Sequence, residues 1–179
     1  MRQLVQLDVL IRAFVVAHRV RFLDPIMWLL SAVGRSGIVW LAIGAVLALR
    51  RRISRAGVTA LVLAILAASV VANDLLKPAF HRTRPFVANV DVAVIGGRPG
   101  SASFPSGHAA TAFAGALTLS RAAAAPAVWW WVLAAAIAYS RIYLGVHYPL
   151  DVVAGSIVGL ACAALVLRVM KIDRPAPRT

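Results

Sequence analysis

The sequence predicts an all-α integral membrane protein, a single domain over residues 1–179 built as a bundle of about six helices. Hydrophobic residues make up 61% of the chain, and the mean hydropathy is +0.84. Several apolar stretches approach the roughly 20 residues that a helix needs to cross a bilayer. Charged and histidine side chains gather at the ends of these stretches. Because ionisable groups are costly at membrane depth, this placement indicates a functional site at the helix ends on one membrane face.

Residues 1–34 are predicted to contain an interfacial helix and the first helices of the bundle. An amphipathic helix is expected over residues 4–17, because its apolar side chains fall on one stripe: Leu4, Leu7, Ile11 and Phe14. A second segment covers residues 22–33, where Asp24-Pro25 is typical of a helix start. Both segments are short, and the sequence does not decide which of them crosses the membrane.

Residues 36–170 are predicted to hold the core spans. A short apolar run over residues 36–49 is followed by four longer ones, over 56–76, 107–120, 126–139 and 150–170. Gly155 and Gly159 form a Gly-xxx-Gly pair in the last run, which permits close contact between helices. The stretch over residues 78–105 is rich in proline and glycine, and we expect a loop on the active-site side.

The basic residues predict the orientation in the membrane. If the four late spans alternate, the polar clusters at residues 77–84, 106–108 and 141–151 share one side. The opposite side receives a larger group of basic residues: Arg50, Arg51, Arg52, Arg55, Arg121, Lys171, Arg174 and Arg178. The positive-inside rule places that group in the cytoplasm. We therefore expect a multi-pass protein of the cell inner or plasma membrane, with its active site on the extracytoplasmic side.

The formal net charge of +13 is compatible with a nucleic acid partner, but its distribution argues against one. The arginines between residues 50 and 55 flank an apolar run and do not line a soluble face. Basic residues in this position serve membrane topology and contact anionic lipid headgroups. We expect membrane lipids as partners and no nucleic acid, and the sequence assigns no oligomeric state.

His147 and Asp151 are candidates for nucleophilic chemistry. Pro149 can occupy the first turn of the last helix and would place Asp151 in that turn. The carboxylate could then accept a hydrogen bond from the His147 ring, which would leave the other ring nitrogen free as a nucleophile. The alternative is a capping aspartate beside an interfacial histidine.

The tetrapeptide Pro105-Ser106-Gly107-His108 is typical of a helix start that can bind an anion. Ser106 suits the N-cap, and Gly107 would let a bound anion approach the backbone N–H groups. His108, in the first turn, is placed to donate a proton to a leaving oxygen. The alternative is an ordinary serine-capped helix.

Three basic residues, Lys77, Arg84 and Arg141, could neutralise phosphate oxygens. Alternatively, each could be a cation at the membrane edge. We interpret Arg82 and Arg98 as membrane-edge cations, either of which could grip a second phosphate group.

Together these clusters resemble the three-part signature of the type 2 phosphatidic acid phosphatase superfamily. The match covers eleven specified positions without a departure: Lys77-x6-Arg84-Pro85, Pro105-Ser106-Gly107-His108 and Ser140-Arg141-x5-His147-x3-Asp151. The resemblance implies that His147 is the nucleophile, Asp151 its partner and His108 the general acid. It also implies that no metal or other cofactor is needed, and it assigns phosphate binding to Lys77, Arg84, Ser106, Gly107 and Arg141.

The favoured hypothesis is a membrane hydrolase that cleaves a lipid phosphate through a phosphohistidine. The chain is similar to bacterial polyprenyl (undecaprenyl or decaprenyl) diphosphate phosphatases, which recycle the lipid carrier of the cell envelope. The alternative substrates are phosphatidylglycerophosphate, lipid A and decaprenylphosphoryl-phosphoribose, and transfer of the phosphoryl group to another lipid is a further possibility. A non-catalytic binder or flippase would need no acid–base histidines. A metal site on His108, His147 and Asp151 is disfavoured, because three nearby cations would repel a divalent ion.

Overall fold

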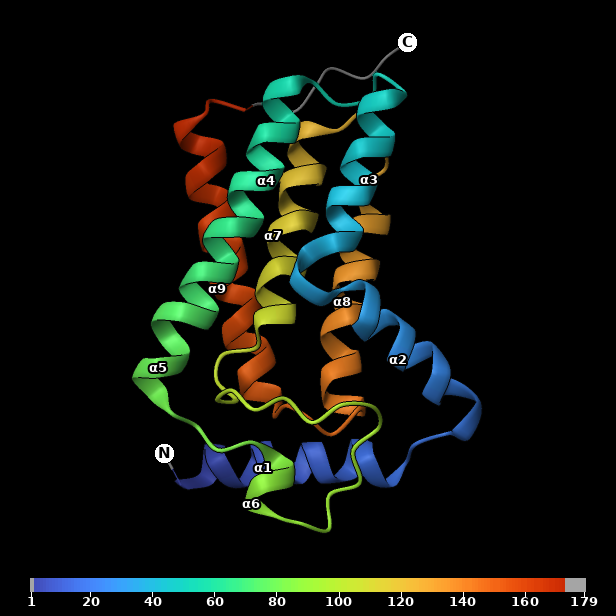
Figure 1. The fold of residues 1–179 in the computed structure, drawn as a ribbon, viewed down its shortest axis with the longest axis vertical. Helices are drawn as coiled ribbons and strands as arrows, with labels where there is room; N and C mark the ends of the chain where they lie inside the picture. Colours follow the sequence, from blue (N-terminus) through green and yellow to red (C-terminus); the bar gives the residue numbers. More distant parts are fainter. Residues whose placement is uncertain (1, 173–179) are drawn as a thin grey trace.

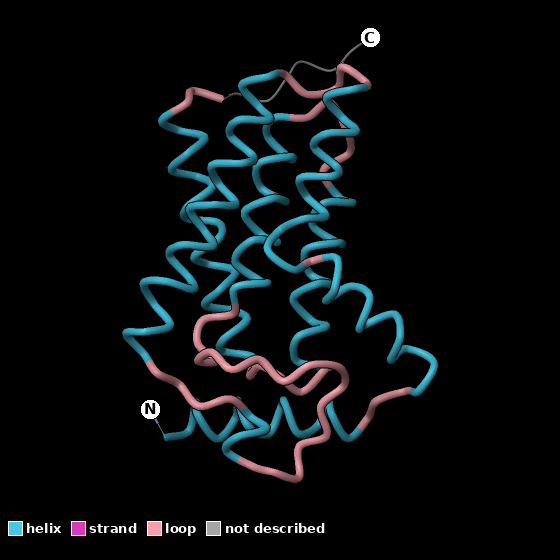
Figure 2. Tube along the Cα trace, viewed as in Figure 1, coloured by secondary structure: helices cyan, strands magenta, loops and turns pink. Residues whose placement is uncertain are grey.

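The long helices run side by side and form a bundle, as a computed structural model of the protein shows (Figure 1). The structure describes residues 2–172. Figure 2 shows helices joined by loops, and within the described residues the one strand-like feature is an isolated backbone bridge between Ile53 and Ala123. The bundle contains α3 (Ile38–Leu49), α4 (Arg55–Val70), α7 (Gly107–Ala122), α8 (Val128–Tyr143) and α9 (Pro149–Val169). The predicted all-α class is confirmed.

The first helix, α1 (Arg2–Ala17), lies across one end of the bundle (Figure 1). Its predicted apolar stripe faces outward: Leu4, Leu7, Ile11 and Phe14 are all exposed. Asp8 and Arg12 are buried against the protein instead, with 2% and 7% of the residue exposed. A surface helix of a water-soluble protein would have the opposite arrangement. This orientation suits a helix that contacts lipid with its outer face.

Two short helices together make the first long apolar element. After a 3₁₀ turn, η1 (Arg21–Leu23), α2 (Asp24–Val33) leads through η2 (Arg35–Gly37) into α3. The chain bends at η2, where Ser36 and Gly37 have positive φ angles of 51° and 75°. Residues 21–49 are long and apolar enough to cross a membrane, as are residues 55–88 and 149–169. The two predicted segments over residues 22–33 and 36–49 therefore form one bent element.

Helix α4 begins at a serine cap, in which Ser54 Oγ accepts a hydrogen bond from Gly57 N at 3.0 Å. It continues through a π-helical turn, η3 (Val71–Leu76), into α5 (Lys77–Phe80). Turns of this kind are frequent at functional sites. Residues 81–106 then form the long loop, which contains the short helix α6 (Pro85–Ala88) and lies at the same end of the bundle as α1 (Figures 1 and 2).

Small residues bring α4, α7 and α9 close together. Alanines from all three helices form one buried cluster: Ala64, Ala68, Ala72, Ala110, Ala114 and Ala163. A Cβ atom at Gly155 would lie 2.3 Å from Ser106 O, and one at Gly159 would lie 2.1 Å from Ala110 O. The Gly-xxx-Gly pair therefore allows α9 to contact the backbone of α7, as predicted. This contact also joins the two helix starts, because Ser106 N donates to Asp151 O at 2.8 Å.

Candidate active site

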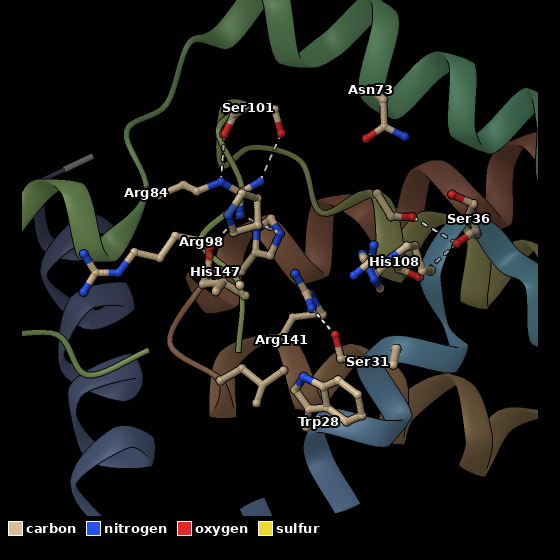
Figure 3. Close-up of a pocket in the computed structure, with 18 of the residues that line it drawn as sticks. Trp28, Ser31, Ser36, Asn73, Arg84, Arg98, Ser101, His108, Arg141 and His147 are labelled. Atoms are coloured by element: carbon tan, nitrogen blue, oxygen red, sulfur yellow. Dashed lines mark hydrogen bonds between the residues drawn. The ribbon is translucent and has the colours of Figure 1, made fainter. Parts of the chain in front are cut away.

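A cavity of about 420 Å³ lies at the end of the bundle that carries the long loop. Its walls come from the helical elements α2, η2, α4, η3, α5, α7 and α8, from the loop and from the α8–α9 connection. Figure 3 shows the side chains that converge on it. Five basic side chains line it, and no acidic side chain does so among the described lining residues. The five are Arg35, Lys77, Arg84, Arg98 and Arg141. The cavity therefore has the charge of an anion-binding site.

His147 and Asp151 are held together at the start of α9. Pro149 begins this helix, as predicted, and Asp151 lies in its first turn. Asp151 Oδ2 accepts a hydrogen bond from Tyr148 N at 2.9 Å and lies 3.3 Å from His147 Nδ1. The hydrogen-bond network assigns the ring proton to Nδ1, so Nε2 keeps its lone pair. Nε2 lies 3.2 Å from Arg84 Nη1.

The His147 ring is neutral at neutral pH. Its side chain is 2% exposed, and burial, reinforced by the charges of Arg84 and Arg141, lowers its pKa from 6.5 to about 3 against the opposing effect of Asp151. The contact with Asp151 is therefore a hydrogen bond from a neutral imidazole. A neutral ring with one nitrogen oriented and the other unprotonated is the form that a nucleophile requires.

Ser106 and His108 begin α7 beside this pair. Ser106 is the predicted N-cap, and its Oγ accepts a hydrogen bond from Ala109 N at 3.4 Å. Ser106 is fully buried behind the cavity wall, whereas His108 lines the cavity. Figure 3 shows His108, Arg141, His147 and Arg84 grouped around it.

Two of the predicted cations are held by the structure around them. Arg84 Nε donates to Ser101 O at 2.7 Å, and its Nη1 donates to Val146 O at 2.9 Å. Lys77 Nζ donates to Asn73 Oδ1 at 2.8 Å. These contacts point both cations into the cavity before a ligand arrives, which is the preorganisation that electrostatic catalysis needs.

Arg141 has an unsatisfied donor at the cavity. One of its terminal nitrogens donates to Ser31 Oγ, but its Nε has no hydrogen-bond partner within the described part of the chain. The side chain is only 7% exposed. A buried N–H group without a partner is costly. Because Nε itself is shielded from solvent, Arg141 lines the cavity with other atoms of its side chain.

Packing against Asn73 also requires a glycine at position 107. A Cβ atom at this position would lie 2.5 Å from Asn73 Oδ1. The glycine thus makes room for the amide that holds Lys77. The expectation that Gly107 lets an anion approach the backbone stays a prediction.

Sequence reasoning missed three residues that surround Asp151. Arg82 Nη1 donates to Asp151 Oδ1 at 2.6 Å, and Arg82 Nη2 donates to Asp8 Oδ2 at 2.5 Å. Ser103 Oγ donates to Asp151 Oδ2 at 2.5 Å. The interpretation of Arg82 as a membrane-edge cation is therefore wrong, because the side chain bridges two carboxylates. The sequence did contain an indication that Asp8 has a role, because the chain has only six acidic residues and Asp8 is one of them.

Two other residues singled out in the sequence lie away from His108 and Arg141 or outside the cavity. Ser140 is fully buried, and its Oγ donates to Ile137 O at 2.7 Å within α8. Arg98 lines the cavity, but its guanidinium carbon lies 5.7 Å from the centre of the Phe86 ring. Figure 3 shows the Arg98 side chain extending away from Arg141 and His108.

An oriented imidazole that faces a cavity of cations, at one end of an apolar helical bundle, defines the class of a membrane phosphoryl-transfer enzyme. The chain belongs to the PAP2 superfamily, which matches residues 57–174. It is 32% identical over 146 residues to the undecaprenyl-diphosphatase of Sulfolobus acidocaldarius, covering 79% of this chain and 68% of that protein.

A second relative and a solved structure agree with this family. The decaprenylphosphoryl-5-phosphoribose phosphatase of Mycolicibacterium smegmatis is 37% identical over 126 residues, which cover 70% of this chain and 67% of that protein. The fold is similar to the crystal structure of Aquifex aeolicus LpxE, with a TM-score of 0.79 and 30% identity, over 90% of this chain and 95% of that one. The protein is a membrane lipid phosphatase of the PAP2 superfamily.

The lowered pKa of His147 predicts a pH dependence of stability. Below pH 6.5 the unfolded chain binds a proton at this ring, but the folded protein does not until the pH approaches 3. The contribution of His147 to the free energy of unfolding should therefore be constant above pH 6.5. Below pH 6.5 the free energy of unfolding should fall, by about 1 to 2 kcal/mol at pH 5. Thermal unfolding in detergent measures this loss.

The matched variants are His147→Gln, which removes the group, and His81→Gln, which removes an exposed loop histidine. The loss between pH 7 and pH 5 should be smaller in His147→Gln than in the parent and unchanged in His81→Gln. An equal loss in parent and His147→Gln would contradict the assignment of a neutral buried ring.

Proposed function

We propose that the protein hydrolyses polyprenyl diphosphate at the extracytoplasmic face of the cell membrane, through a phosphohistidine at His147 and without a metal. The observation that supports this proposal is the position of the two ring nitrogens of His147. Its Nδ1 lies against Asp151 and its Nε2 lies 3.2 Å from Arg84 Nη1, beside the cation-lined cavity. Nε2 accepts a hydrogen bond from Arg84 Nη1, and a phosphate that took over this donor would meet the lone pair of Nε2.

The reaction takes two steps. Nε2 attacks the terminal phosphorus and the bond to the bridging oxygen breaks, while His108 gives a proton to the leaving lipid monophosphate. Water then attacks the phosphohistidine and loses a proton to His108, which releases inorganic phosphate and restores both rings. Lys77, Arg84 and Arg141 stabilise the charge on the equatorial oxygens in both steps.

Metal independence rests on the charge of the cavity. Its lining offers five cations that could take the place of a divalent ion at the phosphate oxygens. Within residues 2–172 no three His, Cys, Asp or Glu side chains are grouped to hold a metal ion. The residues present thus suit direct binding of phosphate by the protein.

A diphosphate fits the distribution of cations better than a single phosphate does. Arg35, from η2, lines the cavity and belongs to none of the three sequence clusters. Arg82 is occupied by two carboxylates, and Arg98 lies over Phe86. Arg35 is therefore the best candidate to bind the second phosphate group, which replaces our expectation that Arg82 or Arg98 would do so. The similarity to an undecaprenyl-diphosphatase supports the same substrate.

A second candidate substrate is a polyprenyl lipid that carries a phosphopentose. The similarity to a decaprenylphosphoryl-5-phosphoribose phosphatase favours it. Hydroxyl-bearing side chains of Ser31 and Ser36 lie on the same wall as Arg35 and could bind sugar hydroxyl groups. Phosphatidylglycerophosphate and lipid A remain further candidates for the same chemistry.

The nucleophile is tested by substitution of the His147–Asp151 pair. His147→Ala should lower kcat by about a thousandfold or more, because no other side chain can form the covalent intermediate. Asp151→Asn should lower it by about 100- to 10,000-fold through loss of ring orientation and charge. Phosphate release by purified protein measures both, and an acid-labile, base-stable phosphoryl label on the protein should require His147.

The same assay tests metal independence. Activity should survive a chelator, and Cys162→Ala should serve as a control variant with parent activity. Near-parent turnover in His147→Ala would refute the nucleophile. Loss of activity in chelator that one divalent ion restores would refute the metal-independent mechanism.

The substrate is tested by comparing kcat/KM for polyprenyl diphosphate, polyprenyl monophosphate, phosphatidylglycerophosphate and a phosphopentose-bearing polyprenyl lipid. The diphosphate should be preferred. Arg35→Gln should lower kcat/KM for the diphosphate by about 10-fold, the value of one lost charged hydrogen bond, and leave the monophosphate unchanged. Arg121→Gln, at the opposite end of the bundle, is the matched control. A preference for another lipid would replace the named substrate but leave the phosphatase mechanism standing.

The orientation in the membrane is part of the proposal. The α3–α4 and α7–α8 connections lie at the end opposite the loop and α1 (Figure 1). That end carries exposed arginines, among them Arg50, Arg52, Arg55 and Arg121; Arg174 and Arg178 of the predicted group lie outside the described residues. The site end also carries basic residues, but most of them are used by the site or its supports, such as Arg19, whose Nε donates to Tyr143 O. We assign the exposed arginine end to the cytoplasm.

Single cysteines in a Cys162→Ala background test this orientation. Gly100 lies in the loop, where an added Cβ meets no atom within 4 Å, and Pro126 is exposed in the α7–α8 connection. An impermeant thiol reagent should label Gly100→Cys in intact cells and Pro126→Cys only after the membrane is opened. The reverse pattern would invert the assigned topology.

A further inference from the structure

Asp8, in the helix that lies across the end of the bundle, is connected to Asp151 through one arginine. Arg82 Nη1 donates to Asp151 Oδ1 at 2.6 Å, and its Nη2 donates to Asp8 Oδ2 at 2.5 Å. The side chains of both aspartates are 0% exposed, and that of Arg82 is 24% exposed. A single guanidinium thus bridges two buried carboxylates that come from α1 and α9.

We propose that Asp8 and Arg82 are positioning residues for Asp151, so that α1 is part of the catalytic apparatus. This inference rests on the proposed function, in which Asp151 orients the nucleophile. Neither Asp8 nor Arg82 lines the cavity. Both therefore act on the reaction through Asp151 and have no direct contact with substrate.

Contacts on both carboxylate oxygens fix the plane of Asp151. Oδ1 accepts from Arg82, while Oδ2 accepts from Ser103 Oγ and Tyr148 N and faces His147 Nδ1. Without Arg82, Oδ1 would lose its one described partner and the carboxylate could rotate. Rotation would carry Oδ2 away from His147 and leave the ring free to turn.

Asp8 holds the same turn from a second direction. Its Oδ1 accepts a hydrogen bond from Leu150 N at 2.7 Å, in the first turn of α9. Arg82, which it also binds, lies over the ring of Tyr148, with its guanidinium carbon 4.2 Å from the ring centre. Tyr148 and Leu150, which lie between His147 and Asp151, are therefore held by Arg82 and by Asp8, and the carboxylate at position 8 contacts both Arg82 and Leu150 N.

The orientation of α1 supports a role beyond simple packing. Its apolar stripe is exposed, so much of its attachment comes from the polar side. A helix attached mainly by packing would instead turn its large apolar side chains inward. The polar side that faces the bundle carries Asp8 and Arg12, both buried.

The test uses Asp8→Asn and Arg82→Gln in the full-length protein in detergent, with Asp8→Glu and Arg82→Lys as conservative variants. Matched controls are Asp91→Asn and Arg21→Gln, which make the same charge changes at exposed positions on the site side. The first two variants should lose about 10- to 100-fold in kcat, the cost of misplacing a catalytic group, while KM stays within about twofold of the parent. The conservative variants should recover part of the loss.

The shape of the pH profile separates positioning from loss of folded protein. The groups that face Asp151 are the cation Arg82 and the neutral rings of His147 and Tyr148, with Asp8 behind Arg82. The charges of Arg84 and Lys77 also act on Asp151. A carboxylate without its cation takes up a proton more readily, so the acid limb of the kcat profile should move to higher pH in Arg82→Gln. In Asp8→Asn the cation Arg82 stays and a neighbouring negative charge is lost, so the acid limb should move to lower pH. A merely structural defect would lower kcat by one factor at every pH.

Either of two results would overturn the inference: kcat values in Asp8→Asn and Arg82→Gln equal to those of the controls, or losses that are uniform across pH and match a fall in the folded fraction. Failure of the proposed function is a separate outcome. In that case the parent itself releases no phosphate, or His147→Ala retains activity. An active parent with an inactive His147→Ala and an unaffected Asp8→Asn would reject the positioning role alone.

Discussion

The burial of Asp151 is the constraint on which the rest of the site depends. A carboxylate that is fully removed from solvent at the end of an apolar bundle is costly unless charge and hydrogen bonds surround it. The structure supplies Arg82 on one oxygen and Ser103, Tyr148 N and His147 on the other. The same contacts leave the carboxylate a single orientation, so the groups that make its burial tolerable also aim the imidazole.

Close helix packing makes this arrangement possible. Gly155 and Gly159 let α9 touch the backbone of α7, and Ser106 N then donates to Asp151 O. The starts of two helices therefore meet at one point. The first-turn side chains of the two helices are thereby brought together, and the N-termini of both helices add positive potential.

Features that depend on short sequence spacing could be predicted, and those that depend on distant contacts could not. The four-residue spacing of His147 and Asp151, the serine cap of α7 and the Gly-xxx-Gly pair follow from helix geometry, and the structure contains each of them. Asp8 and Arg82 are 74 residues apart, and no periodicity relates them. The outward stripe of α1 was visible in the sequence, but its buried polar side acquires meaning only when α1 lies across the bundle.

The position of the cavity at the end of the bundle has a consequence for selectivity. A space lined by Lys77, Arg84 and Arg141 attracts every small anion, so its charge alone cannot distinguish a lipid phosphate from a dissolved one. The cavity lies at the end of the helical bundle, where the phosphates of membrane lipids are confined to a thin layer. Confinement raises their effective concentration far above that of the same group in free solution. The confinement of lipid phosphates to the membrane surface, more than the affinity of the cavity for phosphate, then determines which phosphates enter.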